Sequence, residues 1–545
     1  MRRVRRAVGA AAAVGCLLGA GVLSGCGSSG SSGSAELVRI GSAGTIDSLS
    51  PFLLTLLGAA ELETIQYPFL VQYDSTTAIK PDFAQSWTFS ADKKALTLKV
   101  ATGGKWSDGQ PLTADDVAWT YNTIVKDAAG GTAALAPYIP DVTGAKANGA
   151  DEVTIEFKAP SPHALGEIVN IPILPRHVWE KYAANGGKGL TTFNNPAPVV
   201  GGGPFYVAKY SKGQSVLLKR NPGYYGPKPH VNAIGFSLYS NSDAMTKALQ
   251  AGEVDAVENV PPPSLKAVRS SGANVQTPDS IIAMWLNINS TPNNPDKELA
   301  DPVVRQALDA AINRSQIVST AYFGAATPGS SVIPSALPPY HKDVAVESYD
   351  PATANALLDQ AGYKKGSDGI RVANGHPMSY SMVVIASPGS GIDSAANILR
   401  EDFKQVGIKL KVTSLDPTAA IAGIFGPKKD YKSEFQFSLG RIASSFDPGS
   451  FLSYFSCAGK GSSNYSGYCE KPFEALMQKQ SSEPSNPARV DEVQQLQDMI
   501  ARDRPSLVLA YEKGAFAYRS PWTGFTPGPL GWFLDKFTAQ SIQKG

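Results

Sequence analysis

The sequence predicts an α/β fold with at least two lobes, and three observations support this prediction. The chain has 545 residues, which is too long for one hydrophobic core, so two or three domains are expected. Strand-like alternation and helix-like periodicity of apolar residues replace one another along the chain. A strand at 380–386, a helix at 393–406 and a strand at 408–412 follow in the order of a β-α-β unit, whose two strands lie parallel.

The first half of the chain predicts two strands with a helix between them. Apolar residues alternate at 96–100 and again at 153–157. Between these strands, Thr113 is followed three residues later by Asp116, which is an approximate capping box at a helix start. Asp115 and Asp116 are therefore expected to be acids of the first helical turn and not a catalytic pair. The helix places three apolar residues on one face: Val117, Tyr121 and Ile124.

The middle of the chain is expected to be rich in β-structure. Two strands, 205–210 and 214–219, form a predicted hairpin. A further strand at 233–239 leads to a helix that begins near Ser242, and Gly252 is expected to end it. The order is strand, strand, strand, helix.

The second half repeats one device for starting helices. Asp301-Pro302 and Asp350-Pro351 each place an N-cap aspartate before a proline at the first helical position. An apolar strand at 281–288 precedes both helices. A helix at 488–502 and a strand at 507–511 close the chain, which completes the α/β class.

The N-terminus predicts an export signal. Residues 1–6 hold four arginines and residues 7–22 are apolar. Since a bilayer-spanning helix needs roughly 20 apolar residues, a transmembrane anchor is the weaker interpretation. The ending Leu23-Ser24-Gly25-Cys26 resembles a bacterial lipobox, which predicts a signal peptide over 1–25, a lipid on Cys26 and a flexible tether over 26–35. Both the general secretory and the twin-arginine export routes stay open.

Composition and motifs exclude several classes of function. Lys+Arg is 49 and Asp+Glu is 47, and loss of the four signal arginines changes the net charge from +2 to −2, so no nucleic-acid partner is expected. The five histidines are scattered without the spacing of metal ligands, so neither a metal nor a cofactor is expected. No catalytic elbow or phosphate loop is present, so the chain is not expected to be an enzyme. A secreted hydrolase is the alternative from another class.

The four cysteines predict one disulfide bond. Cys16 leaves with the signal peptide and Cys26 takes the lipid, so Cys457 and Cys469 remain as a pair. Outside the cytoplasmic membrane, oxidation of such a pair is permitted. We expect it to close a loop rich in glycine and serine, and two free thiols are the alternative.

Several short motifs occur in one order along the chain. Residues 81–87 read P-D-F-A-Q-S-W, and residues 105–117 read K-W-S-D-G-Q-P-L-T-A-D-D-V. Weaker motifs follow at 203–206, 219–222, 248–255, 304–308, 349–351, 361–363 and 406–408. Together they resemble family 5 of the extracytoplasmic substrate-binding proteins of ABC transporters, the dipeptide- and oligopeptide-binding type. The resemblance extends from about residue 35 to the C-terminus.

The resemblance implies a two-lobed periplasmic-binding-protein-like clamp of type II, cluster C, with an extra inserted domain. Lobe I would combine residues 36–76, 197–285 and 505–545, inserted domain II would be 77–196, and lobe III would be 286–504, with two hinge strands between the lobes. Such a protein closes its lobes around a solute and delivers it to ABC permease subunits. A monomer, held outside the cell membrane by its N-terminal lipid, is expected.

The motif that binds the ligand's amine is only partly present. In peptide-binding relatives, a stretch like G-W-x-x-D-x-x-D-P supplies an aspartate for the free amine. Here 440–448 reads G-R-I-A-S-S-F-D-P, so Ser444 takes the place of that aspartate and Arg441 replaces the tryptophan. The arginine that dipeptide binders use for the carboxylate would fall near Ala386 or Ser387. Longer or capped oligopeptides are therefore the expected ligands, with oligosaccharides or other uncharged solutes as the alternative.

The candidate ligand contacts come from both lobes. Arg441 could bind an anionic group of the ligand or form an ion pair within the protein. Trp285 could stack on a ligand or belong to the core, and Asp447 could instead cap a helix. Nickel binding, another activity in the family, has no support from histidines. The full set is Trp285, Asn287, Arg441, Ser444, Phe446 and Asp447 on lobe III, with Ser50, Pro51 and Phe52 on lobe I.

Overall fold

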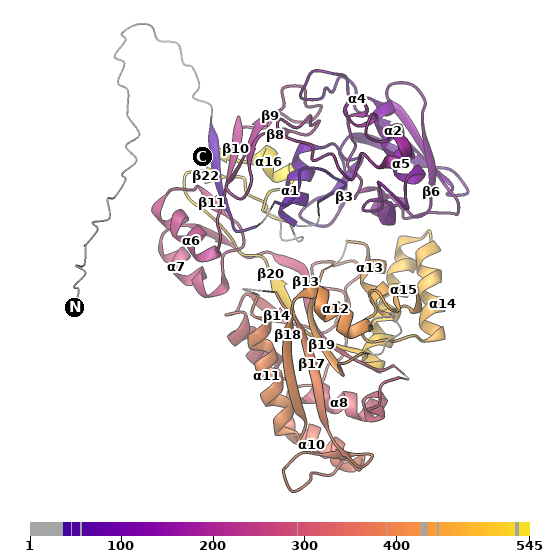
Figure 1. The fold of residues 1–545 in the computed structure, drawn as a ribbon, viewed down its shortest axis with the longest axis vertical. Coiled ribbons are helices and arrows are strands. Elements are labelled where there is room, and N and C mark those ends of the chain that lie inside the picture. Colours follow the sequence, from indigo (N-terminus) through magenta and orange to yellow (C-terminus); the bar gives the residue numbers. More distant parts are fainter. Residues whose placement is uncertain are drawn as a thin grey trace, which may run out of the picture.

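The computed structural model of the chain forms two lobes that meet through long strands (Figure 1). The signal peptide, Cys26 and the whole of the tether lie outside the described residues, and so does Ser444. Lobe I and the inserted domain form the upper part of Figure 1, and lobe III forms the lower part. The residues that the structure describes are 36–44, 46–54, 57–291, 293–387, 390–426, 433–443, 446–528 and 533–545.

Lobe I is built on a mixed sheet. β1 lies parallel to β10 and β11, whereas β8, β9 and β10 form an antiparallel meander, so the predicted hairpin is confirmed. The helices of this lobe are α1 (Leu57–Gln66), α6 (Ser242–Ala251), α7 (Leu265–Ser270) and α16 (Lys536–Ser541). In the described residues the strand order is β12 (Asn274–Gln276), β21 (Phe516–Tyr518), β11 (Ala256–Val257), β1 (Leu37–Ser42), β10 (Ala233–Leu238), β9 (Ser215–Arg220) and β8 (Phe205–Ser211).

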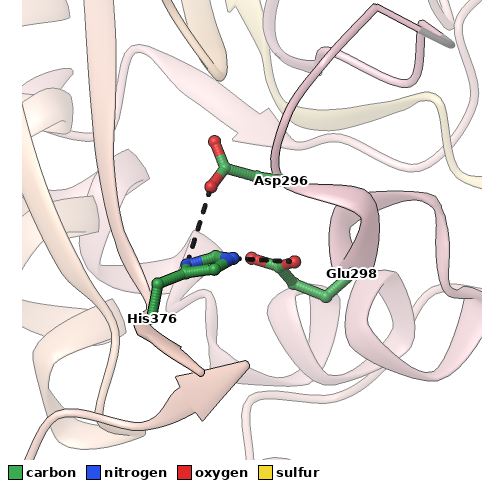
Figure 2. A group of neighbouring side chains, drawn as sticks. All are labelled: Asp296, Glu298 and His376. Atoms are coloured by element: carbon green, nitrogen blue, oxygen red, sulfur yellow. Dashed lines mark ion pairs between the residues drawn. The ribbon is translucent and has the colours of Figure 1, made fainter. Parts of the chain in front are cut away.

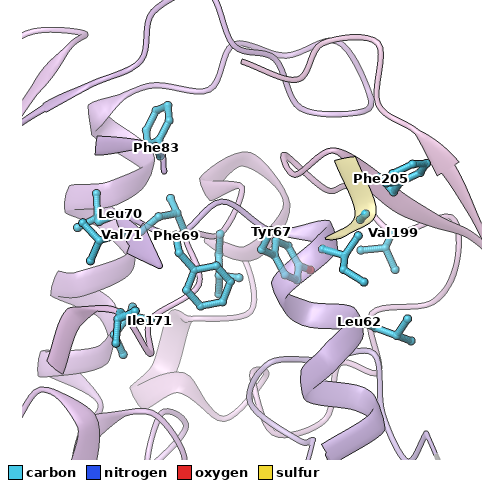
Figure 3. Packing of buried hydrophobic residues seen from close by; sticks show 14 of the residues in the cluster. Leu62, Tyr67, Phe69, Leu70, Val71, Phe83, Ile171, Val199 and Phe205 are labelled. Atoms are coloured by element: carbon cyan, nitrogen blue, oxygen red, sulfur yellow. The ribbon is translucent and has the colours of Figure 1, made fainter. Parts of the chain in front are cut away.

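The core of lobe I continues into the inserted domain. Leu62 of α1 and Tyr67, just after it, are buried beside Phe205 at the start of β8 (Figure 3). Phe69 and Ile171 belong to the same cluster and are joined by the apolar residues of the inserted domain. Burial of these aromatic and branched side chains is the main contribution to the stability of lobe I and the inserted domain.

The inserted domain is an antiparallel sheet packed against one long helix, α2 (Ala114–Lys126). The predicted capping box is confirmed, because the Thr113 N–H donates to the Asp116 carboxylate at 3.0 Å. The predicted apolar face of α2 is fully buried. The sheet order is β4 (Ala84–Phe89), β5 (Ala95–Val100), β7 (Glu152–Phe157) and β6 (Val142–Ala147), with α3 (Ala164–Ile168), α4 (Arg176–Trp179), α5 (Ala184–Gly187) and the ribbon of β2 (Val71–Tyr73) and β3 (Ile79–Pro81) beside it.

A buried ion pair joins the C-terminal segment to the P-D-F-A-Q-S-W motif. The Asp82 carboxylate accepts hydrogen bonds from the Lys536 ammonium and the Tyr225 hydroxyl, and from the Phe69 N–H at 2.9 Å. Both charged side chains are almost fully buried, at 2% and 3% exposure for Lys536 and Asp82. Burial lowers the pKa of Lys536, whereas the Asp82 charge opposes this shift. The motif aspartate, at the start of the inserted domain, therefore holds α16 of lobe I in place.

Lobe III carries the predicted β-α-β unit. β17 and β18 are parallel over seven residue pairs, and α11 (Ile392–Gln405) connects them, as the sequence predicts. In the described residues the strand order is β14 (Ala326–Pro328), β20 (Ser506–Lys513), β13 (Asp279–Ile288), β19 (Phe437–Ile442), β17 (Ser379–Ile385) and β18 (Lys409–Leu415). The other helices are α8 (Pro302–Ala311), α9 (Arg314–Gln316), α10 (Pro351–Gln360), α12 (Pro417–Phe425), α13 (Pro448–Leu452), α14 (Lys471–Ser482) and α15 (Asn486–Asp503).

Two strands cross from one lobe into the other. β13 and β20 pair antiparallel from Asp279–Lys513 to Asn287–Ser506, in the middle of the lobe III sheet. The sheet thus contains residues 279–285 and 506–513, which the predicted limits place in lobe I. The two strands are included because their hydrogen-bonded pairing continues without a break through the hinge and past the predicted lobe boundary. The domain limits themselves stay a prediction.

Local signals in the sequence predict the helix ends correctly. The Asp301 carboxylate accepts from the Val303 N–H at 2.9 Å, and the Asp350 carboxylate accepts from the Ala352 N–H at 2.9 Å. Gly252 adopts φ 79° after α6, a conformation that costs other residues free energy. Both N-cap aspartates, and the glycine that ends α6, lie where the sequence predicts them.

Cys457 and Cys469 form the predicted pair, with their Cα atoms 4.8 Å apart. The loop between them is packed around Asn464, whose side-chain amide donates to the carbonyls of Ser456 at 3.0 Å and Tyr468 at 2.6 Å. The loop is therefore fixed by hydrogen bonds as well as by the cysteine pair. Two small antiparallel ribbons complete the fold, β15 (Val372–Ala373) with β16 (His376–Pro377) and β22 (Trp522–Thr523) with β23 (Gln543–Lys544).

Candidate ligand-binding site

The lobe I candidates lie on a buried turn after β1. The Ser50 carbonyl accepts from the Leu53 and Leu54 N–H groups, which closes the turn. Ser50 and Pro51 are buried, and the Phe52 ring lies edge-on to Trp179 at 5.4 Å between centroids. The Ser50 hydroxyl is buried and has no hydrogen-bond partner among the described residues. Since buried hydroxyls are normally paired, a ligand or water would satisfy this group.

A polar network supports this turn. The Asn195 amide donates to the Leu49 carbonyl at 2.8 Å and to the Tyr67 hydroxyl at 2.9 Å. Glu63 lies near Tyr67, and its charge contributes to the raised pKa of that phenol, which burial dominates. Burial raises the pKa of Glu63 to about 8. The turn that carries Ser50 is therefore supported from behind by a buried network of a phenol, an amide and one carboxyl group with a raised pKa.

A hollow of about 650 Å³ opens beside the same turn. Its walls come from the residues just before the turn, from the end of the inserted domain and from the segments around β8, and none of them lies on lobe III. The residues that line it are Asp47, Ser48, Leu49, Asn194, Pro196, Ala197, Ala208, Lys209, Tyr210, Ser211 and Lys212. It is therefore not the space between the lobes.

Two lobe III candidates lie inside the lobe itself. Trp285 is fully buried and packs against Tyr454 at 5.6 Å and Phe455 at 5.5 Å between centroids. Asn287 bridges the two strands beside β13, because its amide donates to the Ser438 hydroxyl at 3.3 Å and its carbonyl accepts from the Ser506 hydroxyl at 2.6 Å. In this conformation both side chains serve the lobe III core and sheet.

Arg441 forms an ion pair within lobe III. Its Nε and Nη2 donate to the two carboxylate oxygens of Glu512 at 2.7 and 2.6 Å, and its Nη1 donates to the Ser387 hydroxyl at 2.9 Å. Glu512 also accepts from the Tyr322 hydroxyl at 2.8 Å. Burial lowers the pKa of Arg441, but its hydrogen bonds to Glu512 and the charge of Glu512 together outweigh this effect and raise it. The arginine side chain is still 28% exposed, so one edge can reach a ligand.

Phe446 and Asp447 lie where the two lobes touch. The Phe446 ring meets Tyr73 of β2 edge-on at 4.4 Å between centroids. Asp447 caps α13 by accepting from the Gly449 N–H at 2.8 Å, and it pairs with Arg489 at 2.8 Å. Asp447 therefore acts as a helix cap in this structure, which is the second of the two interpretations that the sequence allowed. Ser444, the remaining candidate, cannot be placed because it lies outside the described residues.

A second contact between the lobes involves His163. Its Nε2–H donates to the Glu483 carbonyl at 2.6 Å, so a residue of the inserted domain is fixed to lobe III. Burial and the nearby Arg489 charge lower the pKa of His163. Burial, with the charges of Asp141 and Asp447, raises the pKa of Glu167 to about 7. The lobes are therefore in contact, and an ionisable group lies at that contact.

Comparison with known proteins identifies the family. The family described as bacterial extracellular solute-binding proteins, family 5 Middle, matches residues 78–463, which is more than half of the chain. The chain belongs to this family. Its relatives include the dipeptide-binding protein of Escherichia coli K12, 27% identical over 521 residues and covering 90% of this chain and 92% of that protein. The oligopeptide-binding protein AppA of Bacillus subtilis is 26% identical over 482 residues, covering 86% and 85%.

Solved structures confirm the fold. AppA from Bacillus subtilis, in complex with a nonapeptide, has a TM-score of 0.75 at 23% identity and covers 93% of this chain and 99% of that chain. NikA from Brucella suis, in complex with Fe(III)-EDTA, has a TM-score of 0.80 at 19% identity, with 93% and 100% coverage. The predicted two-lobed α/β clamp of this family is therefore confirmed.

Family 5 membership settles several expectations. Family 5 proteins are substrate-binding components of ABC transporters and not enzymes, so the hydrolase alternative is excluded. They are extracytoplasmic, bind peptides or other small solutes and work with ABC permease components. In the described part of the chain, no helix has the length and apolarity needed to cross a membrane.

Several residues at this family 5 site could not be predicted from the sequence. Glu512 is 71 positions from Arg441, and Glu483 is 320 positions from His163, so only the fold brings each pair together. Arg489 and Tyr73 likewise carry no motif. A search for acids on the last strand would have found Glu512, since it lies on β20, which neighbours β13.

Proposed function

We propose that this chain is the lipid-anchored, oligopeptide-binding component of an ABC importer. Lipid on Cys26 and a tether over 26–35 hold it at the cell membrane, and it acts as a monomer. The ligand lies between the lobes, in contact with Ser50, Pro51 and Phe52 on one side. On the other side it meets the segment from Arg441 to Asp447, next to Trp285 and Asn287.

One observation supports long or capped peptides over dipeptides: among the candidate contacts that the structure describes, Arg441 and Asp447, the two charged side chains, are both already paired within the protein. Ser444 stands where relatives place an aspartate for the amine, and a neutral hydroxyl forms a contact about half as strong. The guanidinium of Arg441 is already neutralised by Glu512. Affinity then comes from backbone hydrogen bonds and apolar contacts along an extended peptide.

Binding acts through the equilibrium between open and closed lobes. A ligand shifts this equilibrium only by its difference in affinity for the two forms, so contacts with both lobes are required. The Tyr73–Phe446 and His163–Glu483 contacts exist only when the lobes are close. These contacts therefore stabilise the closed form in addition to the ligand, and the closed form is the one that would deliver the ligand to a permease.

Native mass spectrometry of the protein purified from its own host is the first test, because it identifies a bound solute directly. A thermal-shift series then compares dipeptides, longer peptides, peptides with blocked ends and oligosaccharides. We expect longer and blocked peptides to raise the melting temperature, with a stabilisation of about 2.7 kcal/mol at a hundred times Kd. Tight binding of free dipeptides, or of oligosaccharides alone, would contradict the peptide assignment.

Two variants and one gene deletion test the details. Ser444→Asp restores the aspartate of relatives, so it should strengthen binding of peptides with a free amine and leave acetylated peptides unchanged. Cys26→Ser should release the protein from membranes in a fractionation experiment. Deleting the partner permease genes should abolish peptide uptake, whereas a purely signalling receptor would keep its output.

A further inference from the structure

Three potential metal ligands meet in lobe III, outside the candidate ligand-binding site. Asp296 and Glu298 lie just before α8, and His376 lies on β16 of the small β15–β16 ribbon (Figure 2). One ligand atom from each residue lies within 4.8 Å of the other two. Figure 1 places α8 and α10 toward the end of lobe III that points away from lobe I. None of the nine candidate ligand contacts belongs to this cluster.

The spacing of the three side chains leaves room for an ion. The imidazole lies between the two acids, with Nδ1 3.9 Å from Asp296 and Nε2 3.8 Å from Glu298 (Figure 2). Both distances are too long for hydrogen bonds. Ligands of a tetrahedral Zn²⁺ ion, at 2.0–2.2 Å from the metal, are about 3.4 Å from one another. These two distances involve different ring nitrogens, and with one ligand atom from each residue the three atoms lie within 4.8 Å of one another. A contraction of up to about 1.4 Å, together with a turn of the imidazole, would therefore bring the three groups to coordination distance.

The two carboxylates are already oriented by neutral donors. Glu298 is 2% exposed, and its oxygens accept from the Tyr380 hydroxyl at 2.7 Å and the Asn374 amide at 3.3 Å. The neighbouring Gln436 side chain favours the charged form of Asp296. Neutral groups that orient ligating carboxylates are typical of metal sites, where they fix the ligand geometry.

The charge of the cluster is not balanced by lysine or arginine. Within the described residues, neither Asp296 nor Glu298 has a lysine or arginine nitrogen within 4.0 Å, and the His376 imidazole is the basic side chain that approaches both. Both carboxylates instead approach the same imidazole, at 3.9 Å for Asp296 and 3.8 Å for Glu298. A buried carboxylate is costly unless it is paired or coordinates a cation. The local field therefore favours a divalent cation.

The histidine can adjust to such an ion. One ion takes only one ring nitrogen, so the imidazole must turn from its position between the acids. Its side chain is 38% exposed, and its one short contact within the described residues, from Nδ1 to the Pro377 carbonyl, is 3.5 Å long. Rotation therefore breaks no strong hydrogen bond. Solvent can supply the remaining ligand.

We propose that Asp296, Glu298 and His376 form a binding site for a divalent transition-metal ion, with Zn²⁺ as the best match. Two carboxylates and one imidazole suit this borderline ion, and water completes a four-coordinate site. The ion would join the segment before α8 to the ribbon that leads into β17. Its role is to stabilise lobe III, and it is separate from the ligand-binding site between the lobes.

Zinc titration of the full chain tests this site. The chain is stripped with EDTA, dialysed and titrated with Zn²⁺ by calorimetry, and its melting temperature is recorded with and without Zn²⁺. We expect one zinc ion at this site and a higher melting temperature. His376→Gln should weaken zinc binding at least tenfold, because even loss of a supporting group costs about 10–100-fold. Tyr380→Phe tests that support and should weaken binding without abolishing it.

His177→Gln is the matched control. His177 is 36% exposed and lies 2.8 Å from a single carboxylate, Asp108, so it shares the exposure of His376 but not its second acid. Zinc held by cysteines near the N-terminus would be common to both variants and cancels in the comparison. Co²⁺ in place of Zn²⁺ should give a visible absorption band in the parent chain and in His177→Gln only.

Two results would overturn the proposal. One is equal zinc affinity of His376→Gln and His177→Gln, which would place the ion elsewhere. The other is a parent chain that shows neither zinc binding nor a thermal shift. Because His376 is partly exposed, the variant should fold, and the melting temperature without zinc checks this. Peptide affinity, measured with and without zinc, should be unchanged, so the result is independent of the proposed ligand.

Discussion

The two lobes contain the same arrangement of charges at two different depths. Where lobe I meets the inserted domain, Asp82 pairs with Lys536 and accepts from the Tyr225 hydroxyl. In lobe III, Glu512 pairs with Arg441 and accepts from the Tyr322 hydroxyl. The lysine in lobe I is 2% exposed, whereas the arginine in lobe III is 28% exposed. The first pair can only serve the fold, and the second can also reach a ligand.

This difference teaches that burial decides what an ion pair can do. A fully buried pair leaves an uncompensated charge when one partner is lost, which is costly. A pair with an exposed edge loses less, because water replaces the partner, and the freed group becomes available to solutes. The variants that follow test this distinction, from the largest expected effect to the smallest.

Lys536→Met should have the largest effect on stability. It leaves the Asp82 carboxylate buried without its cation, and loss of one partner of a buried pair costs about 3–5 kcal/mol. Chemical denaturation measures the free energy of unfolding. Lys266→Met, at an exposed position of α7, is the control and should be nearly neutral. A double variant, Asp82→Asn with Lys536→Met, should recover part of the loss, and no recovery would contradict the ion-pair account.

Glu63→Gln should change the pH dependence of stability. Burial raises the pKa of Glu63 from 4.5 to about 8, so the folded state holds a proton that the unfolded state releases above pH 4.5. The stabilisation is full below pH 4.5 and is lost as pH rises toward 8, by up to about 1.4 kcal/mol per unit. The free energy of unfolding, measured from pH 5 to 8, should show this slope in the parent chain. An unchanged slope in Glu63→Gln would show that another group is responsible.

Glu512→Gln should cost less stability and alter ligand preference. Loss of the charged acceptor is expected to lower the free energy of unfolding by about 1–3 kcal/mol. The freed Arg441 should then bind peptides with a terminal carboxylate more tightly than the corresponding amides. Ser387→Ala removes the third guanidinium contact without changing charge, and it should leave this preference unaltered. Equal affinities of acid and amide peptides for Glu512→Gln would contradict a ligand-facing Arg441.

Glu167→Gln should have the smallest effect, on the pH dependence of binding. Burial and the charges of Asp141 and Asp447 raise the pKa of Glu167 to about 7, and Asp447 belongs to lobe III. Opening the lobes removes the Asp447 contribution and the smaller, opposing contribution of Arg489, so the closed form still holds more protons and peptide affinity should rise as pH falls below about 7. We expect a change of less than about tenfold, measured as Kd against pH. Glu156→Gln, exposed on β7, is the control and should keep the parent slope.

Local features are predictable from the sequence because a few neighbouring residues determine them. The N-cap at Asp301, the capping box at Thr113 and the β-α-β unit around α11 are of this kind. The contacts in the candidate site are different. The partners of Arg441 and His163 come from distant segments, so their roles depend on how the lobes pack and not on a motif. The candidate residues themselves follow from the family resemblance, and their contact with a ligand stays a prediction.

The two ends of the described chain lie at one point of lobe I. The Glu36 carboxylate, just before β1, is 3.4 Å from the Lys544 ammonium on β23, and Figure 1 shows the C-terminus beside this region. If Cys26 carries lipid, the ten residues from 26 to 35 reach at most about 35 Å. Lobe I would then stay near the membrane while lobe III moves. A permease would meet one stationary surface and one moving surface, and the moving one would report that cargo is loaded.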